Sequence, residues 1–132
     1  MVEGRRKNSA VDARRDLAER TKKFALRIIR LASKLPKSDV ARVIGRQVLR
    51  SGTSVGANVE EARAAQSRRD FISKMQIALK EARETVYWLR LLVRAEVVAG
   101  EQTLTLIREA TELTCILGAC VVSAKRNAGI EG

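Results

Sequence analysis

Histidine is absent from this sequence of 132 residues, which also holds one proline, two cysteines, one tryptophan, one tyrosine and two phenylalanines. Without histidine, no Ser-His-Asp or Cys-His catalytic set can form. The usual ligand set of a zinc site is incomplete, and the Glu-x-x-His pairs of di-metal helix bundles cannot occur. We therefore expect no enzyme activity, no metal or other cofactor, and no small-molecule substrate.

Long apolar runs are also missing, so we expect no membrane span and no membrane partner. The basic residues near the N-terminus are not followed by the apolar segment of a signal peptide, which predicts a cytoplasmic location. Cys115 and Cys120 are five residues apart on an expected helix and point about 140° away from each other. We interpret both as small apolar helix residues rather than as redox or metal-binding groups.

The scarcity of proline and aromatic residues, together with apolar residues at helical spacing, favours a single all-α domain. Pro36 should help to end the first helix, and Asp12 is a plausible N-cap for it. The expected fold is an antiparallel up-down-up-down four-helix bundle with short loops. Its helices should cover about residues 12–35, 38–65, 68–95 and 102–126, with flexible segments at 1–11 and 127–132.

Apolar residues of the second and third helices predict the core. In the second helix the core stripe should begin at Val40. The third helix carries an unbroken three-four apolar pattern, from Ile72 to Val93. Five more apolar residues lie outside that pattern, namely Phe71, Ile77, Trp88, Leu91 and Leu92. A helix that is apolar on more than one side is buried on more than one side, so these extra positions indicate oligomerisation.

Gly52 and Gly56 lie in the middle of the second helix, four residues apart and therefore on one face. A glycine inside a helix costs about 1 kcal/mol relative to alanine. Two of them on one face favour the close approach of another backbone. The alternative is a flexible break that divides the segment into two short helices.

Positive charge is concentrated in the first helix and its leader, because residues 1–37 hold twelve Lys/Arg and four Asp/Glu, a net charge of +8 out of +11. Six of these cations form one stripe on the expected helix: Arg20, Lys23, Arg27, Arg30, Lys34 and Lys37. No acidic residue lies between Glu19 and Asp39 to compensate them along the chain. A charged stripe is often only a solvated face, but this one favours a binding surface for an anionic partner.

A second basic ridge, Arg42, Arg46 and Arg50, follows one face of the second helix and needs carboxylates or an anionic partner nearby. An antiparallel hairpin of the second and third helices should place Arg50 beside Glu84 and Gly52 near Glu81. Seven residues could then form a polar network: Arg50, Asn58, Glu61, Lys80, Glu81, Glu84 and Tyr87. We interpret it as an ion-pair network that fixes helix register or a subunit contact, rather than as an acid/base or di-metal site.

Two segments carry a family resemblance: RSGTSVGANVEEA at residues 50–62 and DFISKMQIALKEARETVYWLRLL at 70–92. They resemble the four-helix-bundle proteins encoded in intervening sequences of bacterial 23S rRNA genes, in continuous register from about Leu35 to Leu92. The resemblance implies an antiparallel four-helix protomer, a ring-like homopentamer and no enzyme activity. Similar basic pentameric bundles, the accessory subunits of diversity-generating retroelements, bind a reverse transcriptase and its RNA.

The functional hypothesis is a non-catalytic, oligomeric, basic protein that binds RNA. The stripe on the first helix would lie on phosphates, where Lys and Arg release counterions. Aromatic residues are too few for base stacking on them, so readout would depend on charge and shape. Two alternatives stay open: an accessory subunit that binds a reverse transcriptase and its template RNA, and a structural protein whose charge serves only solubility.

Overall fold

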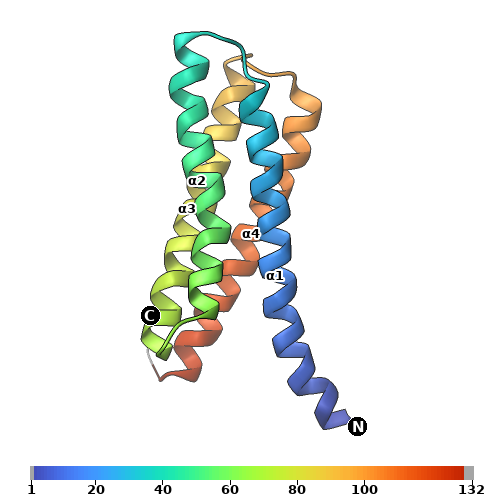
Figure 1. Cartoon of the computed structure of the whole chain (residues 1–132), viewed down its shortest axis with the longest axis vertical. Coiled ribbons are helices and arrows are strands. Elements are labelled where there is room, and N and C mark those ends of the chain that lie inside the picture. Colours follow the sequence, from blue (N-terminus) through green and yellow to red (C-terminus); the bar gives the residue numbers. More distant parts are fainter. Residues whose placement is uncertain (1, 130–132) are drawn as a thin grey trace.

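Four helices make up the regular structure of the chain in a computed structural model that describes residues 2–129, with side chains from residue 13 onward. They are α1 (Val2–Ser33), α2 (Asp39–Arg63), α3 (Arg68–Arg94) and α4 (Gly100–Asn127), and no strand occurs in the described range. The α1–α2 and α3–α4 connections lie at one end of the molecule and the α2–α3 turn at the other (Figure 1). The expected all-α fold with four helices is confirmed.

The first helix is longer than the sequence predicts. It begins at Val2, ten residues before the expected start, so Asp12 lies inside the helix and is not its N-cap. Gly4 and Asn8 each lower helix propensity by no more than about 1 kcal/mol, which does not prevent an existing helix from extending. Figure 1 shows this end of α1 angled away from the other helices. The flexibility predicted for Met1 and residues 130–132 concerns positions outside the described residues.

Serine side chains cap the two central helices and so fix where they begin. The side chain of Ser38 accepts a hydrogen bond from the backbone N–H of Ala41 at 3.2 Å, and Ser67 accepts one from Asp70 at 3.0 Å. Each bond satisfies one of the backbone donors that a helix leaves unpaired in its first turn. The α1–α2 connection and the α2–α3 turn are therefore each defined at the end where the next helix begins.

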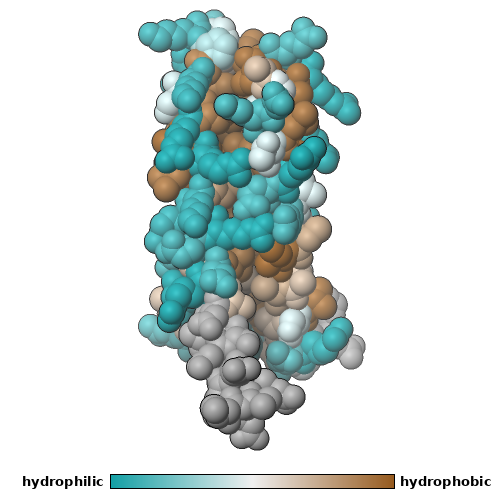
Figure 2. Space-filling model, turned by 90° about the vertical axis from the view of Figure 1, so that its right-hand side faces the viewer, coloured by the Kyte–Doolittle hydropathy of each residue, from teal (hydrophilic) through white to brown (hydrophobic). Residues whose placement is uncertain are grey.

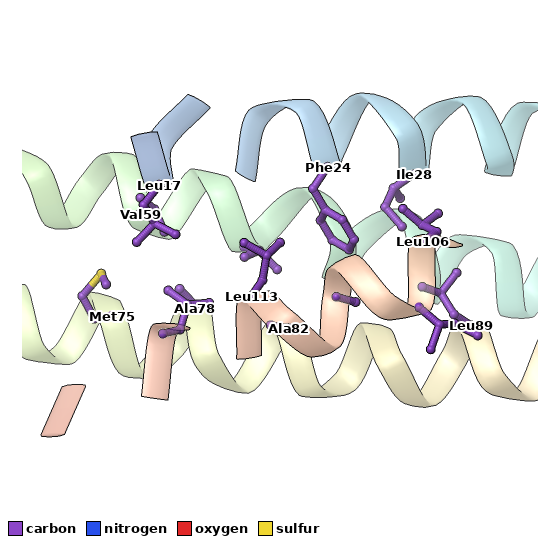
Figure 3. Close-up of a cluster of buried hydrophobic side chains, with 14 of the residues drawn as sticks. Leu17, Phe24, Ile28, Val59, Met75, Ala78, Ala82, Leu89, Leu106 and Leu113 are labelled. Atoms are coloured by element: carbon purple, nitrogen blue, oxygen red, sulfur yellow. The ribbon is translucent and has the colours of Figure 1, made fainter. Parts of the chain in front are cut away.

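A continuous apolar core runs along the axis between the helices (Figure 3). Its largest fully buried side chains include Phe24, Ile28, Leu89, Leu113 and Leu117. Burying a side chain of this size contributes about 1.5–3 kcal/mol each. The core therefore draws on α1, α3 and α4 as well as on the valines of α2.

Two predicted core assignments were wrong. Val40 is 56% exposed, whereas its neighbour Ala41 is 1% exposed, so the buried stripe of α2 starts one residue later. Leu92, placed outside the core pattern of α3, is fully buried. In both helices the buried face is rotated from the apolar pattern, because small residues such as Ala41 and Ala78 occupy core positions where helices lie close together.

Three glycines of α2 face α1 or the connection that follows it. A Cβ atom on Gly52 would lie 2.7 Å from Cγ1 of Ile28, and one on Gly56 would lie 3.3 Å from the carbonyl oxygen of Thr21. Gly45, which the sequence analysis did not single out, would place its Cβ 2.7 Å from Cδ1 of Leu35. The helix is unbroken through all three. The close contacts of Gly52 and Gly56 therefore belong to the packing of α2 on α1.

Candidate nucleic-acid interface

Among the described residues, helix α1 packs chiefly on α2, contacts α4 little and does not lie close to the backbone of α3, so one long side of α1 is left open. Phe24 and Ile28 anchor the opposite side in the core. On the open side, Lys23, Arg30 and Lys34 are exposed. The six cations of the predicted stripe are called the α1 basic face below: Arg20, Lys23, Arg27, Arg30, Lys34 and Lys37.

Five cations of the α1 basic face, all except Arg20, form no ion pair within residues 13–129. Arg27 is half-buried, and its charge contributes to the field at Glu109. Lys37 is exposed in the α1–α2 connection. An uncompensated row of exposed cations attracts a polyanion, because each contact with a phosphate releases condensed counterions.

Arg20 departs from the rest of the stripe. Its Nε and Nη2 donate to the two carboxylate oxygens of Glu109 at 2.9 and 2.8 Å, and Nη2 also lies 3.0 Å from Glu112. Both acids come from α4. The interpretation of the whole stripe as free of nearby acids is therefore wrong at Arg20, because helices distant in sequence lie side by side. Arg20 is therefore bound to α4 along the seam between α1 and α4 and is not free to contact a polyanion.

The pKa of Glu109 is lowered from its usual range, first by the hydrogen bonds from Arg20 and then by the positive charges of Arg20 and Arg27, against the opposing effect of partial burial. The same carboxylates, Glu109 and Glu112, raise the pKa of Arg20. Bidentate contacts of this kind are stronger than neutral hydrogen bonds. The pair therefore ties α1 to α4, the neighbouring helices that contact each other least.

Glu109→Gln is expected to lower the free energy of unfolding by about 1 kcal/mol at pH 7. A partly buried bidentate ion pair stabilises the folded state more than a typical exposed pair does. Because the pKa of Glu109 is lower in the folded chain, its contribution is present above the unfolded pKa of about 4.3 and is lost as the pH falls through the folded pKa. Urea unfolding of parent and variant at pH 7 and at acid pH measures this. Glu112→Gln is the control, because Glu112 is 63% exposed against 20% for Glu109 and should matter less. An equal loss at both pH values would contradict the assignment.

Two hollows lie along the seam between α1 and α4. The upper hollow, of about 800 Å³, lies between the C-terminal half of α1 and the first turns of α4, and Arg27, Arg30 and Lys34 line it. Figure 2 shows a hollow in the upper part of this side, with hydrophobic residues on its floor and hydrophilic side chains around it. The lower hollow, of about 430 Å³, is mainly apolar, and Arg14 lies 5.1 Å above the Phe71 ring that lines it.

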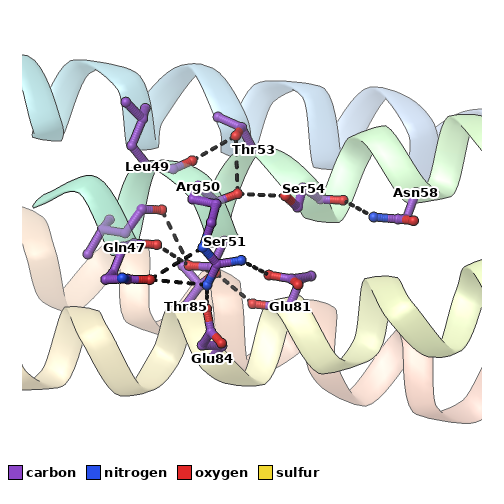
Figure 4. Close-up of polar contacts among 11 residues, drawn as sticks. Gln47, Leu49, Arg50, Ser51, Thr53, Ser54, Asn58, Glu81, Glu84 and Thr85 are labelled. Carbon is purple, nitrogen blue, oxygen red and sulfur yellow. Dashed lines mark hydrogen bonds and ion pairs between the residues drawn. The ribbon is translucent and has the colours of Figure 1, made fainter. Parts of the chain in front are cut away.

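The second ridge of cations is largely paired. Arg42 lies 3.2 Å from Asp39, and Arg50 contacts Glu81 at 3.2 Å and also Glu84 (Figure 4). Arg46 is exposed and forms no ion pair within residues 13–129. The ridge therefore offers a polyanion less free charge than the α1 basic face does.

The predicted seven-residue network is not continuous. The structure joins Arg50, Glu81 and Glu84, and Arg50 also donates to Gln47 at 3.3 Å. Asn58 instead donates to the backbone carbonyl of Ser54 at 2.8 Å, within its own helix. The remaining members do not join this cluster: Glu61 pairs with Lys74 at 2.9 Å, whereas Lys80 and Tyr87 are exposed.

Sequence reasoning missed one polar contact in the core between α2 and α3. Thr85 and Ser51 are fully buried, and Thr85 Oγ1 lies 2.9 Å from Ser51 Oγ (Figure 4). Ser51 Oγ donates to the Gln47 carbonyl at 2.8 Å, so both hydroxyls have partners. These pairs, with Arg50 and Lys74, fix the register of α2 against α3 rather than build a reactive site.

Tyr87 and Trp88 form an edge-to-face pair with ring centroids 5.0 Å apart. Tyr87 is 58% exposed. Trp88 is half-buried, and its buried Nε1 has no hydrogen-bond partner among the described residues. An unpaired buried donor costs free energy, which the packing of the Trp88 ring must offset.

Both cysteines are free thiols, with Cys115 exposed and Cys120 half-buried. Burial raises the pKa of the Cys120 thiol, which keeps it protonated and unreactive. No group of three His, Cys, Asp or Glu side chains that could hold a metal ion occurs in the described part of the chain. Within the same part, no helix is long and apolar enough to cross a membrane.

The fold and the basic seam define a small four-helix-bundle protein with a cationic first helix. Residues 13–119 match the model of the 23S rRNA-intervening sequence protein family, and the chain belongs to that family. A similar solved structure is a protein of unknown function from the S23 ribosomal protein family of Bacteroides thetaiotaomicron. It is 45% identical with a TM-score of 0.75, over 80% of this chain and 97% of that one. No curated protein matches the chain.

Proposed function

We propose that the protein is a non-enzymatic, oligomeric scaffold that binds RNA and recognises the charge and shape of the RNA backbone. The observation that carries the proposal is the α1 basic face, of which Lys23, Arg30, Lys34 and Lys37 are exposed and lack carboxylate partners within residues 13–129. Half-buried Arg27 continues this row toward the seam. The family name links its members to rRNA genes, which agrees with an RNA partner.

The binding mode follows from the chemistry of the face. Lysine and arginine contact phosphates in any sequence, so affinity depends on charge and on the spacing of phosphates. The exposed aromatic ring of Tyr87 lies on α3, away from α1. We therefore propose recognition of a structured RNA backbone with little preference for sequence. A reverse transcriptase partner and a cytoplasmic location stay predictions from the sequence.

Anisotropy titration of the intact protein with a labelled RNA duplex tests this function. Affinity should fall steeply between about 50 and 200 mM salt, because the logarithm of the binding constant falls with the logarithm of salt by about 0.9 for each neutralised phosphate of duplex DNA and about 0.7 for a single strand. Negligible affinity at low salt would contradict the proposal and favour a structural protein whose charge serves solubility.

We also propose that antiparallel up-down-up-down protomers assemble into a ring-like homopentamer. Large apolar side chains remain exposed on all four helices, including Ile29, Val43, Tyr87 and Val122. The extra apolar residues of α3 support oligomerisation less than the sequence suggests, because Leu92 is buried within the protomer. The number five rests on the family resemblance alone.

Native mass spectrometry at micromolar concentration should therefore report five times the protomer mass. A ring would repeat the α1 basic face, and linked weak sites gain avidity without new contacts. A monomer would contradict oligomerisation, and a dimer would contradict the ring.

A further inference from the structure

The upper hollow between α1 and α4 combines two chemistries that a plain basic stripe lacks. Three cations, Arg27, Arg30 and Lys34, line it from successive turns of α1. Apolar side chains line it as well, among them Leu31, Leu35, Val98 and Leu106. Its volume of about 800 Å³ falls in the range of about 300–1,000 Å³ that holds organic ligands.

From this combination we propose that the hollow receives one unpaired nucleotide of the bound RNA, an inference that rests on the proposed function. A phosphate lies against the cations of α1, and the base lies on the apolar floor. Unpaired bases in bulges and loops splay out of the helix and stack on arginine guanidinium planes where aromatic rings are missing. Among the described residues no aromatic ring lines this hollow, and Arg27 and Arg30 supply the planes.

Charge complementarity identifies the occupant as a nucleotide rather than an apolar peptide. Arg30 and Lys34 form no ion pair among the described residues, so both are free to contact an anion in the hollow. Of the described residues that line the hollow, Glu101 alone is acidic, and it lies in the first turn of α4. A flat, partly apolar ring attached to a phosphate satisfies both the cations and the floor.

The inference refines the expected shape readout. The α1 basic face extends beyond the hollow through Lys23 toward the middle of the molecule, where it contacts duplex backbone without regard to sequence. The hollow then selects a duplex that carries a bulged nucleotide over one that is fully paired. Burial of the base makes affinity depend on the presence of an unpaired nucleotide and not on which base it carries.

A filling variant tests the hollow separately from the cations. Thr105 is exposed, lines the hollow and donates its hydroxyl to the Glu101 carbonyl at 3.3 Å. Thr105→Met places a longer, non-aromatic side chain there. Thr111→Met is the matched control, since Thr111 is also exposed on α4, makes the same bond to the Ile107 carbonyl at 2.8 Å, and lies outside the hollow.

Anisotropy titrations at one salt concentration compare a short RNA duplex that carries a single unpaired uridine with the same duplex fully paired. The parent and Thr111→Met should bind the bulged RNA about tenfold more tightly than the paired one. Thr105→Met should lose that preference and bind the paired RNA like the parent. Equal affinity of the parent for both RNAs, or a preference that survives Thr105→Met, would overturn the inference and leave the proposed function standing. Failure of the parent to bind either RNA would overturn both.

Discussion

Gly56→Leu is expected to lower the free energy of unfolding by about 1–3 kcal/mol or more, because the new side chain meets the backbone of α1. A Cβ atom at position 56 would already lie 3.3 Å from the carbonyl oxygen of Thr21. Thr21 cannot turn away easily. It is fully buried, and its hydroxyl is bonded to the carbonyls of Leu17 at 2.9 Å and Ala18 at 3.0 Å.

Gly52→Ala extends the same test with a smaller change. Its Cβ would lie 2.7 Å from Cγ1 of Ile28, a side chain with no exposed surface. We expect overpacking to exceed the gain of about 1 kcal/mol that alanine brings to a helix. Gly118→Ala in α4 is the matched control, because nothing lies within 4 Å of its Cβ position, and it should stabilise the protein. Thermal or urea unfolding that finds Gly56→Leu neutral would contradict the close packing of α1 on α2.

The second large effect concerns RNA. Changing Arg27, Arg30 and Lys34 together to Gln should weaken binding to an RNA duplex by about 10–100-fold at low salt. It should also flatten the slope of log affinity against log salt by about two units or more. Fold and subunit number should survive, because Arg30 and Lys34 are exposed and none of the three forms an ion pair within residues 13–129.

The control for this variant removes the same charge elsewhere. Arg83, Arg90 and Arg94 are exposed on α3, and changing them to Gln also lowers the net charge by three. If RNA affinity follows net charge alone, both triple variants should lose affinity equally. A loss confined to the α1 variant supports the α1 basic face. An unchanged affinity and salt slope in that variant would move the site to the ridge that contains Arg46.

The sequence predicted the number of helices and the limits of α2 and α3 to within two residues. Those limits are set locally, by Pro36 and by the capping serines Ser38 and Ser67. The start of α1 was missed because no proline separates residues 2–12 from the rest of the helix. Capping serines therefore explain the well-predicted starts of α2 and α3, whereas α4 was placed within two residues although its N-cap residue, Ala99, makes no side-chain hydrogen bond.

The partners of individual side chains were harder to predict, because they depend on how helices pack. The spacing of Gly52 and Gly56 predicts a close approach but does not say which helix comes close. Glu109 lies 89 residues from Arg20, so nothing near Arg20 in the sequence reveals the pair. The antiparallel register that places Glu84 beside Arg50 also places residue 74 near Glu61. The ion pair between Lys74 and Glu61 could therefore have been predicted from the sequence.

The most direct test of the central claim is lysine-acetylation footprinting of the unmodified protein with and without a bound RNA duplex, read by mass spectrometry. Lys23, Lys34 and Lys37 should lose reactivity when RNA is bound, because they lie on the α1 basic face. Exposed Lys80 on α3 should keep its reactivity and serves as the internal control. Protection of Lys80 with unchanged reactivity of the three α1 lysines would contradict RNA binding by α1.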